Sequence, residues 1–395
     1  MKESYLLLVQ NIGELLEKAN IPYQFTGVAA LFIQNVELND YREANVSVQW
    51  DVFEEAYDAL EAYSPSTPVK TVETSYTHFV QDGVFVTMSC MYNTTIRTDP
   101  YRLAFTVNNT NLWCRSLYSY LYNEEMACFK EDIHNYLAKE QQEITAENEH
   151  AWNQNNYLGL VNRHGDPTEL AKKIRQNPKW RLHPFYKYLD EVKGKKITHI
   201  MGSNGIKAVA LATLGGDVKV VDFSRDNAKF ACEVAKASNV KLSYVVSDIL
   251  SLSDSHLNGD QDIVLMELGV LHYLVDLHPL LVKVKAMLKP GGRFVLHEFH
   301  PVSTKLITSS GKKHKITGNY FAPSIVKDSI AFTKYMPQEK KPKLSKVIQK
   351  KWTMGELITV VGQSGLVIKV LEEEPNHKIH DMGLPKTFTL VAEYN

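Results

Sequence analysis

Glycine, carboxylate and small polar residues follow several short apolar runs in the second half of the 395-residue sequence. In chain order they are Met201, Gly202, Ser203, Asn204 and Gly205, then Asp222 and Phe223, then Ser247, Asp248 and Ile249, and then Glu267 and Leu268. A carboxylate can accept both hydroxyls of a ribose, and a second one can accept from an adenine amino group. The series therefore indicates a site for an adenosine-containing ligand, with Asp222 and Asp248 as acceptors.

Two histidines and a glutamate near the same runs could move a proton. His300 directly follows the run 293–299, and His272 lies in GVLHYL after Glu267. An unperturbed imidazole titrates near neutral pH. Because side chains alternate along a strand, Glu298 should point away from the side of His297, where it could act as an acid or base or anchor a substrate.

The elements that must position these residues alternate along the chain. Strands are expected at 197–201, 218–222, 242–246, 263–267 and 293–299, with helices reaching 214 and covering 225–238. Strands that alternate with helices of this length form a mostly parallel sheet with both faces covered. Ligands of such α/β sheets bind beyond the carboxyl ends of the strands, which is where the polar series lies.

Four motifs in this region carry a resemblance to a known family. VKVVDFS, YVVSDIL, DIVLMELGVLHYLVD and MLKPGGRFVLHEF occur in order, and together they resemble the class I S-adenosylmethionine-dependent methyltransferases over roughly residues 195–395. The resemblance implies a Rossmann-like, seven-stranded sheet whose last two strands are GLVIKVLEEE and an antiparallel KTFTLVAEY. It also implies S-adenosylmethionine as cofactor, with Asp222 and Asp248 at its adenosine and residues 201–205 at its methionyl end.

The first loop departs from the family pattern. Where the family has an acid, an apolar residue and then Gly-x-Gly-x-Gly, this sequence has His199 at the acid and Met201 and Ser203 at the first two glycines. Only Gly205 stands in register, although Gly202 is expected to restore some backbone freedom. Glu267 is the candidate substitute for the lost acid, and the alternative is a glutamate at the edge of the core that pairs with a lysine.

Methyl transfer from a sulfonium is an in-line displacement that needs a positioned nucleophile and, for most acceptors, a base. His300 is the first candidate base and Glu298 competes with it. The alternative role for His272, which the resemblance implies, is packing against the edge of the cofactor. MELGVL lacks the Asn/Asp-Pro-Pro-Tyr motif of enzymes that methylate base amines. We expect the acceptor to be an oxygen or nitrogen of a small polar molecule, an anionic one included; a catalytically lapsed cofactor-binding regulator or assembly protein and an RNA methyltransferase are the alternatives.

Two segments flank the predicted catalytic sheet. Residues 302–351 are expected to form a lid, because the stretch from Lys305 onward holds twelve lysines against Asp328 and Glu339, interleaved with aromatic residues. Such a lid could bind an anionic molecule or RNA, and the alternative is a merely solvated face. Residues 124–193 are expected to be a helical linker and cap, and the methyltransferase domain is expected at 194–395.

The first 123 residues are expected to form a smaller α+β domain. The order of IPYQFTGVAALFIQ and NVSVQW resembles the small nucleotidyltransferase fold, whose site needs two aspartates for magnesium. Here Val28 replaces its second glycine, and Asn45 and Ser47 stand at the aspartate positions. We therefore expect an inactive scaffold that shapes the acceptor site, recognises a partner or mediates a homodimer.

Composition excludes several classes of protein. With 44% hydrophobic and 23% charged residues and a formal net charge of -1, the chain is typical of a globular protein and not of one that coats nucleic acid or a membrane surface. Its four cysteines lack zinc-site spacing, so no metal is expected; they are Cys90, Cys114, Cys128 and Cys232. The N-terminus lacks a signal-like apolar run, and the expected location is the cytoplasm.

Overall fold

The computed structural model describes residues 2–122, 124–310, 313–376 and 383–395. The chain divides into two compact units: unit 1 is Met1–Leu137 with Phe321–Pro323, and unit 2 is Ala138–Tyr320 with Ser324–Asn395. The division falls inside the segment 124–193 that the sequence predicts as a helical linker. Within the described part of the chain, no helix is long and apolar enough to cross a membrane.

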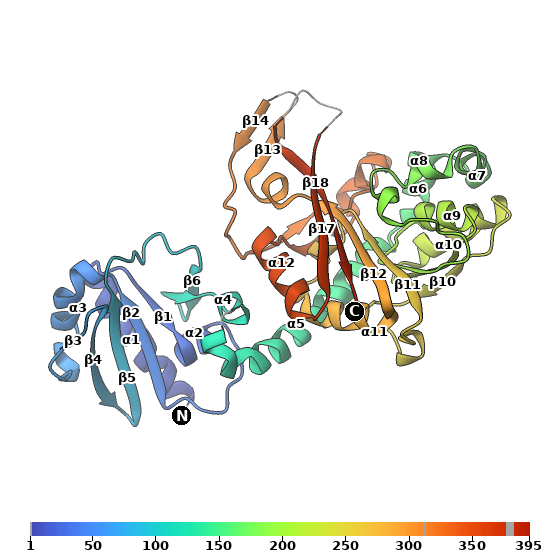
Figure 1. Cartoon of the computed structure of the whole chain (residues 1–395). Helices are drawn as coiled ribbons and strands as arrows, with labels where there is room; N and C mark the ends of the chain where they lie inside the picture. Colours follow the sequence, from blue (N-terminus) through green and yellow to red (C-terminus); the bar gives the residue numbers. More distant parts are fainter. Residues whose placement is uncertain (1, 123, 311–312, 377–382) are drawn as a thin grey trace. The chain divides into compact units, whose positions relative to one another are not determined.

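Unit 1 is built on a seven-stranded sheet in the order β3-β4-β5-β2-β1-β7-β6 (Figure 1). Its strands are β1 (Tyr23–Thr26), β2 (Glu43–Val48), β3 (Val69–Lys70), β4 (Thr74–Gln81), β5 (Val84–Met91), β6 (Arg102–Val107) and β7 (Thr110–Arg115). Its helices are α1 (Lys2–Lys18), α2 (Gly27–Ile33), α3 (Phe53–Ala59) and α4 (Tyr118–Leu121). Helix α1 buries Tyr5, Leu8, Ile12 and Leu16, which recur at helical spacing, in the core of this unit.

The turn after β1 of unit 1 brings Gly27 and Asn45 together, two of the residues on which the sequence based a nucleotidyltransferase resemblance; that resemblance stays a prediction. Thr26 and Asn45 are partners in the β1–β2 pairing, and a Cβ on Gly27 would lie 3.2 Å from Asn45 Nδ2. The Gly27 N–H donates to the Tyr120 hydroxyl at 2.8 Å. No group of three His, Cys, Asp or Glu residues within the described ranges could hold a metal ion. The predicted scaffold role of this unit stays a prediction.

Unit 2 contains the predicted α/β sheet, in the order β10-β9-β8-β11-β12-β18-β17 (Figure 1). Its strands are β8 (Lys196–Ile200), β9 (Asp217–Asp222), β10 (Ser243–Val246), β11 (Gln261–Glu267), β12 (Leu288–Phe299), β17 (Val367–Pro375) and β18 (Pro385–Glu393). β8 to β12 pair in parallel, and β18 lies antiparallel between β12 and β17. The predicted Rossmann-like, seven-stranded fold is therefore confirmed, including the antiparallel last strand.

Helices cover the sheet of unit 2 in two pairs. α9 (Ile206–Thr213) packs on β9, and α10 (Arg225–Ala237) packs on β10 and α9. α11 (His278–Met287) packs on β11 and β12, and α12 (Met354–Gln363) packs on β17 and α11. Two of these helices begin at side-chain caps, because the Ser224 hydroxyl accepts from the Asn227 N–H and Thr353 forms a capping box with Glu356.

Helices also fill the chain before the first strand of this sheet. They are α5 (Lys130–Trp152), α6 (Asn156–His164), α7 (Pro167–Gln176) and α8 (Pro178–Arg181). α6 and α7 pack on α10, and α8 packs on α9. After α5, Asn153 Oδ1 accepts from the Arg225 N–H at 2.9 Å and from the Ser224 hydroxyl at 3.0 Å. This part of the chain thus covers the start of α10, next to the strand end that carries Asp222.

The predicted lid, residues 302–351, has little regular structure. It holds a π-helical turn at Val302–Leu306 and the strands β13 (Ile307–Ser310), β14 (Lys313–Ile316), β15 (Ile325–Asp328) and β16 (Val347–Lys350). β13 pairs with β14, and β15 pairs with β16. Residues 311 and 312 of the predicted lid lie outside the described residues.

Candidate functional site

The register of the parallel strands brings the predicted cofactor residues to one edge of the sheet. Asp222 at the end of β9 is paired with Val246, the residue before Ser247 and Asp248. Glu267 at the end of β11 is paired with His297 of β12, and Leu265 is paired with His199 of β8. The ends of four neighbouring strands therefore meet here, as the sequence predicts for an α/β sheet.

The loop after β8 keeps an unusual backbone at alternate residues. Met201, Ser203 and Gly205 have φ angles of 49°, 47° and 68°, in the left-handed region. These are the three positions that the family motif fills with glycine, and only Gly205 has the residue type that adopts this conformation without strain. Strained backbone of this kind persists where the surrounding structure enforces it, often at functional sites.

Sterics explain the two glycines that the loop has. A Cβ on Gly205 would lie 2.5 Å from Ala231 Cβ of α10, so this residue sets how closely the loop approaches that helix. A Cβ on Gly202 would lie 2.9 Å from both Cγ and Nδ1 of the His199 ring. The sequence predicts that Gly202 restores backbone freedom, but its φ is not left-handed; its small size makes room for His199 instead.

Asp222 is a buried acceptor that ties the loop to α10. Its carboxylate accepts from the Ser203 N–H at 3.0 Å, the Ser224 N–H at 2.9 Å and Asn227 Nδ2 at 3.3 Å. Burial raises the pKa of Asp222, and these donors partly offset the rise. Tyr244 donates to the Ser203 carbonyl at 2.7 Å and holds the same loop. Ribose hydroxyls bound here would share Asp222 with the loop.

Asp248 is more open. Its Oδ2 accepts from both the N–H and the hydroxyl of Ser251 at 3.2 Å, and the residue is half-buried. Burial raises the pKa of Asp248 against the effect of these hydrogen bonds. The Ser247 N–H donates to the Asp222 carbonyl at 3.1 Å, which fixes the two strand ends together. Ile249 is buried, and Phe223 at the end of β9 is half-buried.

Glu267 has a basic partner. Its Oε2 lies 3.2 Å from Lys207 Nζ, in the first turn of α9. Burial alone would raise the pKa of Glu267, but the nearby Lys207 ammonium brings the pKa below its ordinary value. The sequence left open a glutamate that pairs with a lysine, and the structure contains that ion pair. The next residue, Leu268, has a left-handed φ of 39° and donates its N–H to the His297 carbonyl at 2.7 Å.

His199 replaces the acid of the family motif without replacing its charge. Its side chain is fully buried, and burial lowers its pKa to about 4, so the ring is neutral at physiological pH. Neither ring nitrogen has a hydrogen-bond partner among the described residues. A buried polar group without a partner is costly, and such groups often mark a missing ligand or water.

The carboxylate of Glu298, a predicted acid or base, is bound by backbone N–H groups of the loop after β11. Its carboxylate accepts from the N–H groups of Gly269 at 2.5 Å, Val270 at 3.0 Å and Leu271 at 3.3 Å. Burial raises its pKa, and these N–H groups oppose the rise. In this arrangement Glu298 holds the loop after β11 in place. The catalytic role given to it by the sequence stays a prediction that these contacts do not favour.

His300, the first candidate base, is similarly engaged. Its Nδ1 accepts from the Val302 N–H at 3.1 Å, and its Nε2 lies 2.6 Å from Glu373 Oε1. The side chain is only 5% exposed. A base must have a free lone pair within reach of the proton that it removes. Both ring nitrogens of His300 therefore need new partners before the residue could act as predicted.

His272 lies in the short turn after β11. Burial lowers its pKa to about 4, which keeps the ring neutral but makes it a weak base. The ring packs edge-on against Tyr273, with centroids 4.4 Å apart. The packing of His272 against the edge of the cofactor, which the resemblance implies, stays a prediction.

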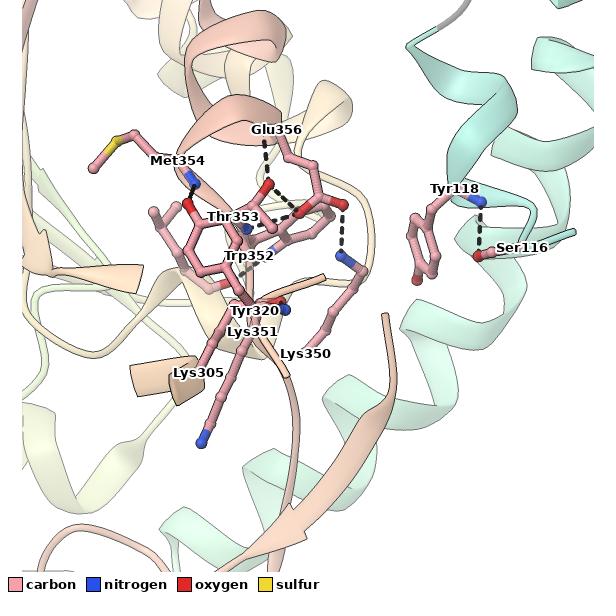
Figure 2. A network of polar contacts seen from close by, with 11 residues as sticks. Ser116, Tyr118, Lys305, Tyr320, Lys350, Lys351, Trp352, Thr353, Met354 and Glu356 are labelled. Atoms are coloured by element: carbon pink, nitrogen blue, oxygen red, sulfur yellow. Dashed lines mark hydrogen bonds and ion pairs between the residues drawn. The ribbon is translucent and has the colours of Figure 1, made fainter. Parts of the chain in front are cut away.

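Buried contacts hold the end of the predicted lysine-rich lid and the residues that follow it within unit 2 (Figure 2). Trp352 Nε1 donates to the Leu271 carbonyl at 3.1 Å, and Lys305 Nζ donates to the Lys351 carbonyl at 2.8 Å. Lys350 is fully buried, lies 3.5 Å from Glu356 and stacks over the Trp352 ring at 3.3 Å. Part of the positive charge that the sequence assigned to an anion-binding surface therefore serves the packing of unit 2.

Sequence reasoning missed Lys207, Asn153 and Tyr244. Each contacts a predicted site residue or its neighbour: Lys207 pairs with Glu267, Asn153 caps the start of α10, and Tyr244 holds the loop at Ser203. Lys207 had one usable signal, because a lysine in the first turn of a helix opposes the helix dipole. The other two have no signal in the sequence, since their roles depend on tertiary contacts.

These residues fit S-adenosylmethionine at the strand ends. Asp222 and Asp248 stand on neighbouring strands for the adenosine, and Gly202 and Gly205 form a loop that has no room for a Cβ. The unpartnered ring nitrogens of His199 are polar atoms beside the loop that would contact the methionyl end. Two of the carboxylates that would bind the cofactor already have partners in the protein. Asp222 accepts from the Ser203 N–H, and Glu267 forms an ion pair with Lys207.

Comparisons with known proteins agree with this description. Residues 201–296 match the family described as "Methyltransferase domain", which also supports S-adenosylmethionine as the cofactor. No curated protein matches the sequence.

Solved structures with a similar arrangement include S-adenosylmethionine-dependent methyltransferases from Listeria monocytogenes and Mesorhizobium loti. Each is 20% identical to this chain; the first covers 56% of this chain and 99% of its own with a TM-score of 0.44, and the second covers 55% and 99% with a TM-score of 0.43. Magnesium protoporphyrin IX methyltransferase from Synechocystis is 13% identical, covers 62% of this chain and 97% of its own, and has a TM-score of 0.40. At these identities the likeness concerns the fold alone.

The matched residues 201–296 begin in the loop after β8 and end in β12, so the match lies in the central part of the sheet of unit 2. Residues 201–296 of unit 2 therefore match a methyltransferase domain, and this match supports the resemblance to the class I S-adenosylmethionine-dependent methyltransferases that the sequence motifs carry.

Proposed function

We propose that unit 2 transfers a methyl group from S-adenosylmethionine to an oxygen or nitrogen of a small polar acceptor. The observation that carries this proposal is the loop after β8, which holds left-handed backbone at Met201, Ser203 and Gly205 beside the carboxylate of Asp222. A strained loop of this kind is maintained at a cost that a purely structural turn does not require. The cofactor supplies a methyl group activated by a positively charged sulfur.

The residues of the chain bind and orient the cofactor. Asp222 and Asp248 accept from the ribose and adenine ends, and Glu267 accepts from the methionyl ammonium. The N–H groups of Ser203, Gly205 and Ile206 already donate to Asp222 Oδ2, the Gly202 carbonyl and Asn204 Oδ1, so the methionyl carboxylate would need another donor. Trp352, fastened to the Leu271 carbonyl, helps close the segment 302–351 beside the loop after β11 and exclude water.

The contacts of the candidate bases limit which acceptor groups could be methylated. His300 and Glu298 are both engaged by protein donors or acceptors, and the lowered pKa of His272 makes it a weak base. A nucleophile that is already deprotonated at neutral pH needs none of them. We therefore propose an anionic oxygen, such as a carboxylate, as the acceptor. The cytoplasmic location and the homodimer expected from the sequence stay predictions.

A second candidate is a cofactor-binding protein that has lost catalysis. The Lys207–Glu267 ion pair and the non-glycine residues at Met201 and Ser203 favour it, because both features depart from the family's loop. An RNA methyltransferase is less favoured, since Lys305 and Lys350 of the basic segment are used in packing.

Methyl transfer can be tested with methyl-labelled S-adenosylmethionine and fractionated pools of small carboxylic acids and phosphorylated compounds. We expect label in a product that mild base hydrolyses, as a methyl ester would be. The variant His300→Gln should keep most of this activity, because His300 is not the base in the proposed reaction. Cofactor binding without transfer to any fraction would favour the second candidate, and label in RNA would favour the third reading.

A further inference from the structure

Lys207 is a basic residue at the position where the cofactor's amino-acid end would lie. It is the second residue of α9, directly after the loop 201–205, and its Nζ lies 3.2 Å from Glu267 Oε2. The Lys207 ammonium also lies 5.3 Å from the centroid of the buried Phe185 ring. The side chains of Lys207 and Glu267 are 22% and 16% exposed, so the pair is held at the surface edge of a largely buried site.

The groups that face this pair from the neighbouring strands carry no charge of their own. His199 on β8 is fully buried and neutral, and both of its ring nitrogens lack a partner among the described residues. His297 on β12 is also neutral because burial lowers its pKa to about 4, and its Nδ1 contacts the Thr389 hydroxyl at 2.9 Å. One positive and one negative group therefore stand side by side next to unsatisfied polar atoms.

This arrangement is complementary to an α-amino acid. The methionyl end of S-adenosylmethionine carries an ammonium and a carboxylate on one carbon. A lysine and a glutamate 3.2 Å apart can each face the opposite charge of such a zwitterion, so four charges alternate in sign. Hydrogen bonds between charged groups, at a site shielded from water, are stronger than those between neutral groups.

We infer that Lys207 binds the methionyl carboxylate while Glu267 binds the ammonium, so that this ion pair selects ligands with an intact amino-acid end. The inference rests on the proposed function and names one residue that the family motif does not contain. It also explains how the chain can have His199 where the family has an acid. The His199 ring is neutral, so Lys207 and Glu267 supply the charges that would contact the amino-acid end of the cofactor.

The alternative role for Lys207 predicts the opposite change in ligand affinity when its charge is removed. If Lys207 only occupies the place of the cofactor's ammonium, it competes with the ligand for Glu267. Removing its charge would then strengthen binding, whereas in our inference it weakens binding.

Calorimetric titration can separate the two with three ligands. S-adenosylhomocysteine has both charged groups, decarboxylated S-adenosylmethionine has only the ammonium at this end, and 5′-methylthioadenosine has neither. The variants are Lys207→Met, Lys207→Arg and, as a control, Lys236→Met in the last turn of α10, which is exposed and far along the helix from the loop. Thermal unfolding of each variant shows whether it is folded.

We expect Lys207→Met to weaken S-adenosylhomocysteine binding by roughly tenfold to a hundredfold, the range of a hydrogen bond between charged groups. Binding of the other two ligands should stay within about twofold of the unchanged protein. Lys207→Arg should restore most of the affinity because it keeps the charge, and Lys236→Met should change nothing.

Equal or tighter binding of S-adenosylhomocysteine by Lys207→Met would overturn the inference. So would an equal loss for all three ligands, which would mean that Lys207 only supports the loop. If the unchanged protein binds 5′-methylthioadenosine as tightly as S-adenosylhomocysteine, the inference fails while the proposed function survives. If it binds none of the three, both fail.

Discussion

The substitution Gly205→Ala tests whether the loop after β8 has the geometry described. Gly205 has a left-handed φ of 68°, and an added Cβ would lie 2.5 Å from Ala231 Cβ. The left-handed backbone costs an L-residue about 1–2 kcal/mol. An overlap of this size in a packed region costs about 1–3 kcal/mol more.

The total loss for Gly205→Ala is about 2–5 kcal/mol in the free energy of unfolding of unit 2. For a unit of this size that loss lowers Tm by roughly 5–15 °C, which differential scanning calorimetry resolves. The same variant should lose binding of S-adenosylhomocysteine, because the loop must move away from α10 to relieve the overlap.

Two matched glycines separate the contributions. Gly291 has a φ of 77° but nothing within 4 Å of an added Cβ, so Gly291→Ala carries the backbone cost alone, about 1–2 kcal/mol. Gly362 lies inside α12 with nothing within 4 Å, so Gly362→Ala should stabilise unit 2 by up to about 1 kcal/mol. The reasoning is refuted if Gly205→Ala is no less stable than Gly291→Ala.

Two further predictions concern charge. Asp248→Ala should weaken S-adenosylhomocysteine binding by roughly tenfold to a hundredfold with little change in Tm, because the Asp248 carboxylate accepts only from the adjacent residues 249–251 among the described residues. Calorimetric titration and a melting curve check this, and unchanged affinity would remove Asp248 from the site. Burial lowers the pKa of His199 from 6.5 to about 4, so as pH falls the unfolded chain binds a proton at this residue before the folded chain does. Up to about 3 kcal/mol of the free energy of unfolding that is present above pH 6.5 is therefore lost between pH 6.5 and pH 4. His199→Phe should reduce this loss in urea unfolding measured across that range, and an unaltered pH profile would contradict it.

The sequence predicts the sheet of unit 2 well because its information is local and periodic. Apolar strands alternate with helices, and the residues that follow each strand must gather at one edge once the strands are parallel. The sequence alone therefore predicts that Asp222 and Asp248 lie close together, and the pairing of Asp222 with Val246 puts them on adjacent strands.

What the sequence could not predict depends on contacts between distant residues. The partners of Glu298 are backbone N–H groups of residues 269–271, about thirty positions earlier in the chain, and no residue pattern reports them. His300 is similar, since Glu373 reaches it from β17. Glycine was expected to serve the loop through freedom of φ, but Met201 and Ser203 adopt the left-handed backbone without it. Tertiary packing can enforce a conformation that residue type alone disfavours.

The central claim is that unit 2 binds S-adenosylmethionine at the loop after β8. Its most direct test is calorimetric titration of the full chain with S-adenosylmethionine and S-adenosylhomocysteine, with Asp222→Ala and Asp222→Asn in parallel. We predict binding of both ligands by the unchanged protein and a strong loss in Asp222→Ala. Asp222→Asn keeps the shape of the side chain and an acceptor for one of the two N–H groups of Ser203 and Ser224, and it serves as the milder comparison. Absence of binding by the unchanged protein would contradict the account.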